Sequence, residues 1–362
     1  MALPLDPGMR ILIVGAGSMG VPLGWALSGG GHHVAHHVAG GTAARMPAEF
    51  RLQVVDRRGL PGGQTPTLRP RYVEKITSRY DAIFVPIKQH EVASVLPLLH
   101  RRGGRADIVF MGDHWDDLEL IEDRLPGRYL LGFQHFSGAL EGDRWCGTVR
   151  RNVRLGEPGG RPSRRLNGLL DALSVAGFVP RPEPRIRDWL QTHFAVNCGF
   201  MTAAVVAGGL ERLARSNEHI GLAIRLIREA LAVARARGAR PDLFPAETGL
   251  TTLSQWAAVL AVRGAARRSD LRSGGISWRA DTTALTSCFR GVVREARRLD
   301  VSTPELDAAG PVVEALRDEL AGPLAGVTEA LAVPMEIEGL IAAERGRPSV
   351  AGYLTPRRSP FV

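Results

Sequence analysis

The sequence predicts an α/β fold, with a doubly wound parallel sheet in the N-terminal half and an all-α domain in the C-terminal half. Short apolar segments rich in β-branched residues alternate with helical segments up to about residue 140, which is typical of parallel strands and their covering helices. From Arg187 onward, apolar residues recur at helical spacing and the strand patterns stop. The length of 362 residues accommodates the two parts as separate domains.

The N-terminal half contains short apolar segments that we predict to be strands. In chain order they are residues 10–14, 34–38, 51–56, 70–76, 81–87, 108–111, 130–133 and 150–155. Helical spacing predicts helices at residues 21–27, 92–99 and 163–176. Turn residues at 60–63 separate the third strand from the fourth, and the Pro-rich segment 180–184 predicts a stiff connector at the end of this half.

The C-terminal half shows helical periodicity between Gly and Pro breaks. The predicted helices are residues 187–211, 217–237, 246–267, 279–299 and 308–332. We therefore expect a first domain over residues 1–183 and a helical domain over residues 184–344. Residues 345–362 are rich in Pro, Gly and Arg, and we expect them to form a loose tail.

The chain is basic, with a formal net charge of +9, but its charge pattern does not favour nucleic acid as a partner. Of its 46 Lys and Arg residues only Lys75 and Lys88 are lysines. The arginines lie beside acidic residues along the predicted helices, as Arg225 does beside Glu229. A nucleic-acid-binding protein would gather them on one face with interleaved aromatic residues.

Apolar runs and cysteines indicate the cellular compartment. No segment approaches the roughly 18 uncharged apolar residues of a membrane span, and the N-terminus lacks the pattern of a secretion signal. Cys146, Cys198 and Cys288 are odd in number and far apart, which argues against a disulfide framework or a zinc site. We expect a cytoplasmic protein without a membrane segment and without a metal.

A glycine motif directly follows the first strand. It reads Gly15-Ala16-Gly17-Ser18-Met19-Gly20, and a helix and another strand come after it. In this context the first glycine makes a tight turn, the second lets a diphosphate approach the backbone, and the third lets helix and sheet pack closely. The helix N-terminus stabilises the anion. The motif predicts a dinucleotide-binding domain, with all six residues in contact with the cofactor.

The end of the second strand indicates which dinucleotide is bound. An NAD site usually offers an Asp or Glu there for the ribose diol. Residues 32–48 contain no acidic residue, but they contain four histidines, among them His37, and Arg45. Cations in place of a carboxylate favour the 2′-phosphate of NADP. The alternative is that these histidines are ordinary strand and loop residues.

Lys88 directly follows the buried strand at residues 81–87. Open α/β sheets bind ligands at the carboxyl ends of their strands, so an ammonium group there can hold a substrate carboxylate or carbonyl oxygen, or contact the cofactor. The alternative is a surface lysine, which is the commoner case. Because the chain uses arginine almost everywhere else, a lysine at this position favours a ligand-binding role for Lys88.

The glycine motif, the strand-then-lysine pattern at residues 85–88 and the helical second half together resemble the ketopantoate reductase family. That family joins a Rossmann domain to a helical domain like that of 6-phosphogluconate dehydrogenases. The resemblance covers roughly residues 9–335 and includes segments 131–133, 193–198 and 291–304. It implies an NADPH-dependent reductase of a 2-oxo acid or a related ketone.

The substrate-facing positions depart from the family pattern. His193 stands where the family places its catalytic lysine, four residues before Asn197, so the two side chains share one helix face. The family's second asparagine falls at Met201 and its glutamate at Leu285. Where the family has an asparagine-glycine pair after the fifth strand, this chain has residues 111–114, and Asp113 lies nearest to the position of the asparagine. The resemblance therefore implies a specialised biosynthetic substrate other than ketopantoate.

The expected site has Lys88, His193 and Asn197 as catalytic residues. His193 would give a proton to the developing alkoxide, since imidazolium is a competent donor near neutral pH. Asp113, His114 and Ser273 are the expected substrate contacts. The alternative for His193 is a structural histidine in a helix interface, in which case His114 or His135 could supply the proton.

Other functions stay open at this point. A C=N bond would suit the same site as a C=O bond, and the fold can serve a non-redox isomerase or cyclase. A protein of another class, a nucleotide-sensing binding protein, would use the same glycine turn. The partner we expect is a small-molecule substrate, and a homodimer is compatible with the apolar surface of the helical half.

Overall fold

The computed structural model describes residues 8–59, 66–77, 79–268 and 282–319. The N-terminal half contains the strands β1 (Arg10–Val14), β2 (His33–His37), β3 (Phe50–Arg57), β4 (Thr67–Leu68), β5 (Tyr72–Val73), β6 (Ala82–Val85), β7 (Asp107–Met111), β8 (Tyr129–Glu141), β9 (Arg144–Gly156) and β10 (Val179–Pro182). Its helices are α1 (Gly20–Gly29), the 3₁₀ turn η1 (Ala43–Arg45), α2 (Gln89–Arg102), α3 (Leu118–Arg124) and α4 (Arg164–Val175).

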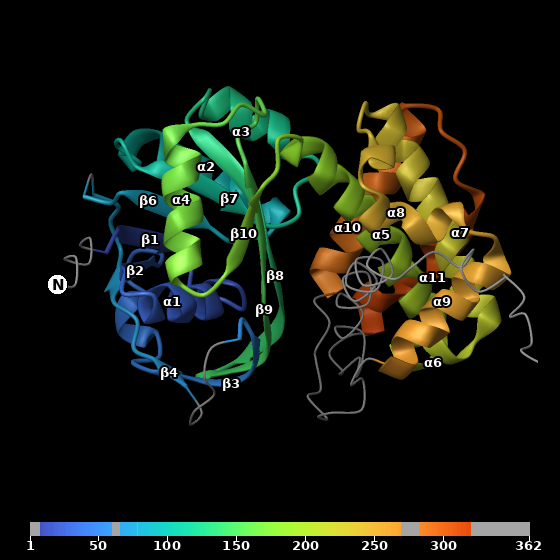
Figure 1. Ribbon diagram of the computed structural model, residues 1–362, viewed down its shortest axis with the longest axis horizontal. Helices are drawn as coiled ribbons and strands as arrows, with labels where there is room; N and C mark the ends of the chain where they lie inside the picture. The colour runs from blue at the N-terminus through green and yellow to red at the C-terminus, as the bar shows by residue number, and fades with distance from the viewer. Residues whose placement is uncertain (1–7, 60–65, 78, 269–281, 320–362) are drawn as a thin grey trace, which may run out of the picture.

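These strands form one sheet with the order β4-β3-β9-β8-β7-β6-β1-β2-β5, and β10 pairs with β9. Side chains alternate between its two faces, as in β1, where Ile11 and Ile13 face one core and Leu12 and Val14 the other. Helices α1 and α4 cover the first face, whereas α2, α3 and the beginning of α5 cover the second (Figure 1). This is the doubly wound arrangement that the sequence predicted.

The sheet is mixed, because antiparallel strands join the parallel ones that the sequence predicted. The strands from β5 through β8 run parallel, but β9 runs antiparallel to β8. Only two residues, Gly142 and Asp143, join these strands, and a parallel crossover needs a dozen or more. β3 pairs with β9 and therefore lies at the far edge of the sheet from β2.

Two further segments differ from the expected elements. The strand expected at 70–76 is shortened to β5, which pairs with β2, and a separate short strand before it, β4, pairs with β3. The Pro-rich connector forms β10, an edge strand parallel to β9, where proline is tolerated because one side of the strand needs no partner. The turn at 60–63, the end of the last predicted helix and the tail at 345–362 lie outside the described residues.

The C-terminal half is helical, as predicted. Its elements are α5 (Ile186–Val206), α6 (Leu210–Arg215), α7 (Asn217–Ala236), the 3₁₀ turn η2 (Pro241–Leu243), α8 (Pro245–Thr252), α9 (Gln255–Arg268), α10 (Thr282–Arg298) and α11 (Pro304–Glu319). They share one apolar core around α5, separate from the two cores of the sheet. The domain boundary expected at residue 183 stays a prediction; it falls between β10 and α5. Within the described residues, no helix combines the length and apolar character needed to cross a membrane.

The two halves are joined by the segment that follows β7. The Trp115 ring stacks on Phe194 of α5, with centroids 4.9 Å apart and planes 15° from parallel. The Arg237 guanidinium lies 4.7 Å from the same indole and donates to the Trp115 carbonyl at 3.0 Å. The next residue, Asp116, pairs with Arg294 of α10. A loop of the sheet is thus bonded to three helices of the other half.

Helix α5 packs closely on α7 because Gly199 has no side chain. A Cβ at this position would lie 2.5 Å from the backbone nitrogen of Ile227. We expect Gly199→Ala to lower the free energy of unfolding by about 1–3 kcal/mol, because overpacking forces the two helix backbones apart. Urea denaturation measures the change.

A matched control is Gly168→Ala on α4, where an added Cβ meets no described atom within 4 Å. It should raise stability by about 0.5–1 kcal/mol through helix propensity alone. Equal effects of the two substitutions would contradict the close packing of α5 on α7.

Candidate active site

The glycine turn is built by two of its glycines. Gly15 has a φ of 94°, in the left-handed region, and its N–H donates to the His37 carbonyl at 2.9 Å. At Gly20 a Cβ would lie 2.7 Å from the Gly15 carbonyl oxygen, so α1 can begin directly against the turn only without a side chain. The Trp145 indole of β9 donates to the Ser18 carbonyl at 2.7 Å and holds the turn from the far strand pair.

The third glycine of the turn fits a bound diphosphate. A Cβ at Gly17 would meet no described atom within 4 Å, so the fold itself gives no reason for a glycine there. Helix α1 has no acidic residue in its first turn and no side-chain cap at Met19. Within α1, the Val21 and Leu23 amides donate to the Gly17 and Met19 carbonyls, and Pro22 has no N–H. The open space beside Gly17, at the positive end of α1, is therefore the feature that suits a dinucleotide diphosphate.

The histidines of the second strand do not all face a nucleotide. His32 accepts from the Met9 N–H and lies 2.9 Å from the Ala172 carbonyl, which ties β2 to α4. His36 is buried under the turn with its Nδ1 3.0 Å from the Gly15 carbonyl, and burial lowers its pKa. These two histidines therefore hold parts of the fold together, as the alternative interpretation of this segment expects.

The other expected cofactor residues lie at the end of β2. Burial also lowers the pKa of His37, although the Glu74 backbone partly offsets this, so the imidazole is a weak cation. Arg45 is exposed in η1 and supplies the positive charge. Glu74 was missed by the sequence argument because it enters from β5, which pairs with β2. Its carboxylate accepts from the Ala43 N–H at 3.0 Å, and this bond leads the lowering of its pKa.

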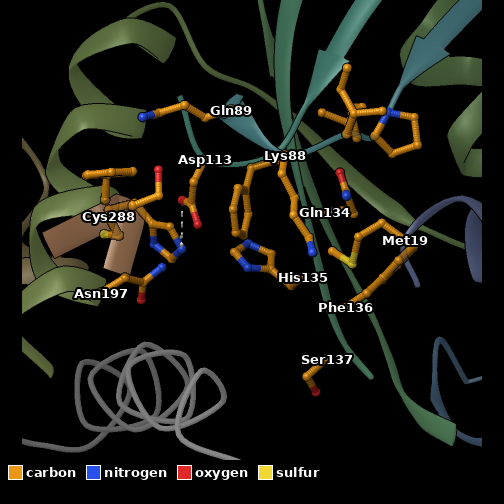
Figure 2. A pocket seen from close by; sticks show the side chains of 18 of the residues that line it. Met19, Lys88, Gln89, Asp113, Gln134, His135, Phe136, Ser137, Asn197 and Cys288 are labelled. Atoms are coloured by element: carbon orange, nitrogen blue, oxygen red, sulfur yellow. Dashed lines mark ion pairs between the residues drawn. The ribbon is translucent and has the colours of Figure 1, made fainter. Parts of the chain in front are cut away.

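A pocket of about 200 Å³ lies between the carboxyl ends of the strands and the helices α5 and α10 (Figure 2). Met19 from the glycine turn, Phe133 and Phe136 from β8, and Phe194 from α5 form apolar parts of its wall. The polar and charged residues of its wall include Lys88, Asp113, Gln134, His135, Arg150, His193 and Asn197. The pocket therefore brings the end of the cofactor turn together with five of the predicted side chains.

Lys88 reaches into the pocket from the segment after β6 (Figure 2). Its backbone N–H donates to the Glu91 carboxylate at 2.9 Å, which fixes Lys88 at the beginning of α2. The side chain is half-buried, and burial lowers its pKa while Glu91 opposes the shift. An ammonium in such a place is stabilised further by an anionic ligand.

His193, on helix α5, is enclosed by aromatic rings from α5 and β8. It stacks on Trp189 with centroids 4.8 Å apart, and its edge meets Phe133 at 4.4 Å. Arg154 lies 4.8 Å from the Trp189 ring. Burial, together with the Arg154 charge, lowers the pKa of His193 to about 3. The imidazole is therefore neutral at pH 7 in the absence of a ligand.

Asp113 faces His193 across the pocket. It follows Gly112, whose φ of 143° turns the chain out of β7. Its Oδ1 lies 4.0 Å from His193 Nε2, and no described residue donates to this oxygen. Burial raises the pKa of Asp113 to about 6, against the opposing effects of His114 and the Asn197 amide. Asn197 Oδ1 is also without a hydrogen-bond partner among the described residues.

Two of the predicted substrate contacts are not among the described residues that line the pocket. His114 is buried, its Nδ1 lies 2.6 Å from Asp117 Oδ2, and its ring meets the edge of Phe110, so it bonds within its own part of the fold and does not line the pocket. Its role as a substrate contact stays a prediction. Ser273 lies outside the described residues.

Two pocket residues from the β8–β9 pair were not predicted from the sequence. Gln134 is 1% exposed, and neither polar atom of its amide has a partner in the described chain. Arg150 of β9 lines the same wall. Alternation along β8 could have indicated Gln134, but Arg150 depends on the hairpin register, which the sequence did not predict. Among the described residues, no group of His, Cys, Asp and Glu could hold a metal ion.

The family model described as ketopantoate reductase PanE/ApbA matches residues 11–155. This part of the chain is therefore similar to the ketopantoate reductase family. A curated relative, the 2-dehydropantoate 2-reductase of Halobacterium salinarum, is 24% identical over 322 residues, which are 84% of this chain and 98% of that protein. The match to the ketopantoate reductase family begins inside β1 and ends inside β9, so it includes Lys88 after β6 and Asp113 after β7.

Solved structures share the fold over both halves. The dimeric ketopantoate reductase of Staphylococcus aureus gives a TM-score of 0.61 at 16% identity and covers 85% of this chain and 100% of that one. A D-mandelate dehydrogenase solved with NADH and anilino(oxo)acetate gives 0.64 at 16% identity, with 87% and 100% covered. These likenesses confirm the predicted fold class of ketopantoate reductases, with its helical C-terminal part.

The open side of Gly17 gives a direct test of the cofactor turn. Gly17→Val should leave the urea unfolding midpoint unchanged, because the added atoms enter free space. It should weaken dinucleotide binding at least about tenfold, because the side chain would fill the space next to the α1 amides. Calorimetric titration with NADPH measures the affinity.

Gly159→Val is the matched control, since a Cβ there also meets no described atom within 4 Å but lies in the turn before α4. Equal NADPH affinity of the two variants would show that the dinucleotide binds elsewhere.

Proposed function

We propose that this protein is an NADPH-dependent reductase of a 2-oxo acid or a related ketone, with a specialised biosynthetic substrate other than ketopantoate. The observation that carries the proposal is the pocket in which Lys88, His193 and Asn197 converge beside Met19 of the glycine turn. The family of the N-terminal part, whose curated relative reduces 2-dehydropantoate, supports the same reaction class.

When bound, the dinucleotide supplies a hydride to the carbonyl carbon. Lys88 binds the substrate carboxylate or carbonyl oxygen through its half-buried ammonium group. The Asn197 amide orients the substrate oxygen, and His193 gives a proton to that oxygen as negative charge develops. Phe133, Phe136 and Phe194 make the pocket wall apolar, which strengthens the electrostatic contribution of these groups.

The replaced family positions support a substrate other than ketopantoate. Met201 and Leu285 stand where the family has an asparagine and a glutamate, and both are buried in the apolar core of the helical half. Neither side chain can bind a polar group of a substrate. A substrate that fits here needs fewer hydrogen bonds from the helical half and more apolar contact.

Arg45 supports NADP as the cofactor. The segment after β2 offers its guanidinium and no carboxylate, and the neighbouring Glu74 accepts backbone amides of that segment. A 2′-phosphate would be stabilised by the exposed arginine. We also propose a cytoplasmic homodimer: the three cysteines are free thiols, and a similar solved structure is described as dimeric.

The reductase is tested by incubation with NADPH and a panel of 2-oxo acids, cyclic imines and enolisable ketones. We expect loss of absorbance at 340 nm with a 2-oxo acid, and His193→Ala should reduce kcat about 100-fold or more. The exposed His33→Ala is the control variant. Turnover of imines alone would favour C=N reduction. Isomerised product without loss of NADPH would favour the non-redox function, and nucleotide binding without any turnover would favour a sensor.

The cofactor preference is tested by Arg45→Ser. We expect this change to raise the KM for NADPH about tenfold and to leave the KM for NADH unchanged, because the serine removes a charge that only the 2′-phosphate meets. Steady-state kinetics with both nucleotides measure the ratio. An unchanged ratio, or tighter binding of NADH by the unaltered protein, would contradict the assignment.

A further inference from the structure

Two titratable side chains from opposite halves of the molecule face each other in the pocket. Asp113 comes from the loop after β7, and His193 comes from α5; Figure 2 shows their facing groups joined by a dashed line. The distance from Asp113 Oδ1 to His193 Nε2 is 4.0 Å. Because Oδ1 is buried without a donor among the described residues, the imidazole is the group nearest to completing its hydrogen bonding.

Burial acts on both groups in the same direction. It opposes the carboxylate, raising the pKa of Asp113 to about 6, and it opposes the imidazolium, lowering the pKa of His193 to about 3. The favoured form at mildly acidic pH is therefore a neutral carboxylic acid beside a neutral imidazole. Below about pH 6 the pair therefore holds one proton, and it lies on the Asp113 carboxyl.

The charged groups around Asp113 and His193 act on their protons in different directions. The titratable and charged groups that face it from the packed elements are Lys88 of α2, His114 of the same loop, His135 of β8, Arg154 of β9 and Cys288 of α10. Arg154 disfavours a proton on His193, and His114 favours a charge on Asp113. Burial outweighs the His114 effect on Asp113, so the carboxyl holds the proton below about pH 6.

We infer that Asp113 and His193 form one proton-donating pair, in which Asp113 stores the proton that His193 passes to the substrate oxygen. This inference rests on the reductase function proposed above, and it explains how a buried, neutral histidine can act in place of a lysine. Asn197 lies beside the Asp113 carboxyl and aligns it.

The transfer balances in atoms and electrons. A bound reduced dinucleotide would supply hydride to the carbonyl carbon, and the carbonyl π electrons would move to oxygen. The O–H bond of Asp113 breaks and leaves its electron pair on the carboxylate, and His193 Nε2 takes the proton. The same nitrogen then releases it to the substrate oxygen, forming the alcohol. Solvent returns one proton to Asp113 before the next cycle.

The pH profile of the unaltered protein follows from this arrangement. The pair must carry its proton, so kcat/KM should be constant below about pH 6 and fall about tenfold per unit above it, since the Asp113 proton is lost there. The Asp113→Asn variant lacks the carboxyl group that holds the proton. We expect kcat/KM at pH 6 to fall about 100-fold and the decline that begins near pH 6 to disappear. The NADPH dissociation constant should not change.

Asp123→Asn, an exposed substitution on α3, is the control and should keep the profile of the unaltered protein. An Asp113→Asn variant that keeps the decline near pH 6 would overturn the inference and leave the proposed reductase in place.

A measurement without substrate separates the two proposals. In ¹⁵N-labelled protein, the His193 ring nitrogens should show a chemical-shift step near pH 6 that Asp113→Asn abolishes. Absence of this step in the unaltered protein would overturn the inference whatever the activity. If the step is present but every 2-oxo acid fails as a substrate, the proposed function and the donating role fail, and the shared proton remains demonstrated.

Discussion

The stacking of Trp115 on Phe194, with Arg237 beside the indole, is the contact on which the pocket geometry depends. Asp113 lies two residues before Trp115 in one half, and His193 lies directly before Phe194 in the other. The rings therefore fix the two side chains relative to each other, although they come from different halves. Asp116 and Arg294 add an ion pair at the same junction, and without this contact neither half contains a complete site.

The site combines apolar enclosure with polar atoms that have no partner in the described protein. Asp113, Gln134 and Asn197 each direct at least one such atom at or near the pocket wall. A buried polar group without a hydrogen bond costs about 1–3 kcal/mol, so a fold that retains several of them together gives up stability at this place. A ligand with matching donors and acceptors would restore those hydrogen bonds.

The features that the sequence predicted are those that depend on neighbours in the chain. The glycine turn, Lys88 after its strand, and His193 one helical turn before Asn197 are all local patterns, and each lies where expected. Glu74 and Arg150 reach the site through strand pairings that the sequence did not predict, β5 with β2 for Glu74 and β9 with β8 for Arg150. The two-residue link between β8 and β9 makes the second pairing antiparallel, and the apolar pattern predicted both of these strands too short.

The hydrogen bond from Trp145 to the Ser18 carbonyl joins the glycine turn to the hairpin whose first strand also carries Phe136 and Gln134. The turn that would bind the diphosphate and the wall that would contact the substrate are thus connected through one hairpin. A ligand that shifts this hairpin from either end would change the affinity at the other end, and the two ligands would affect each other by the same factor.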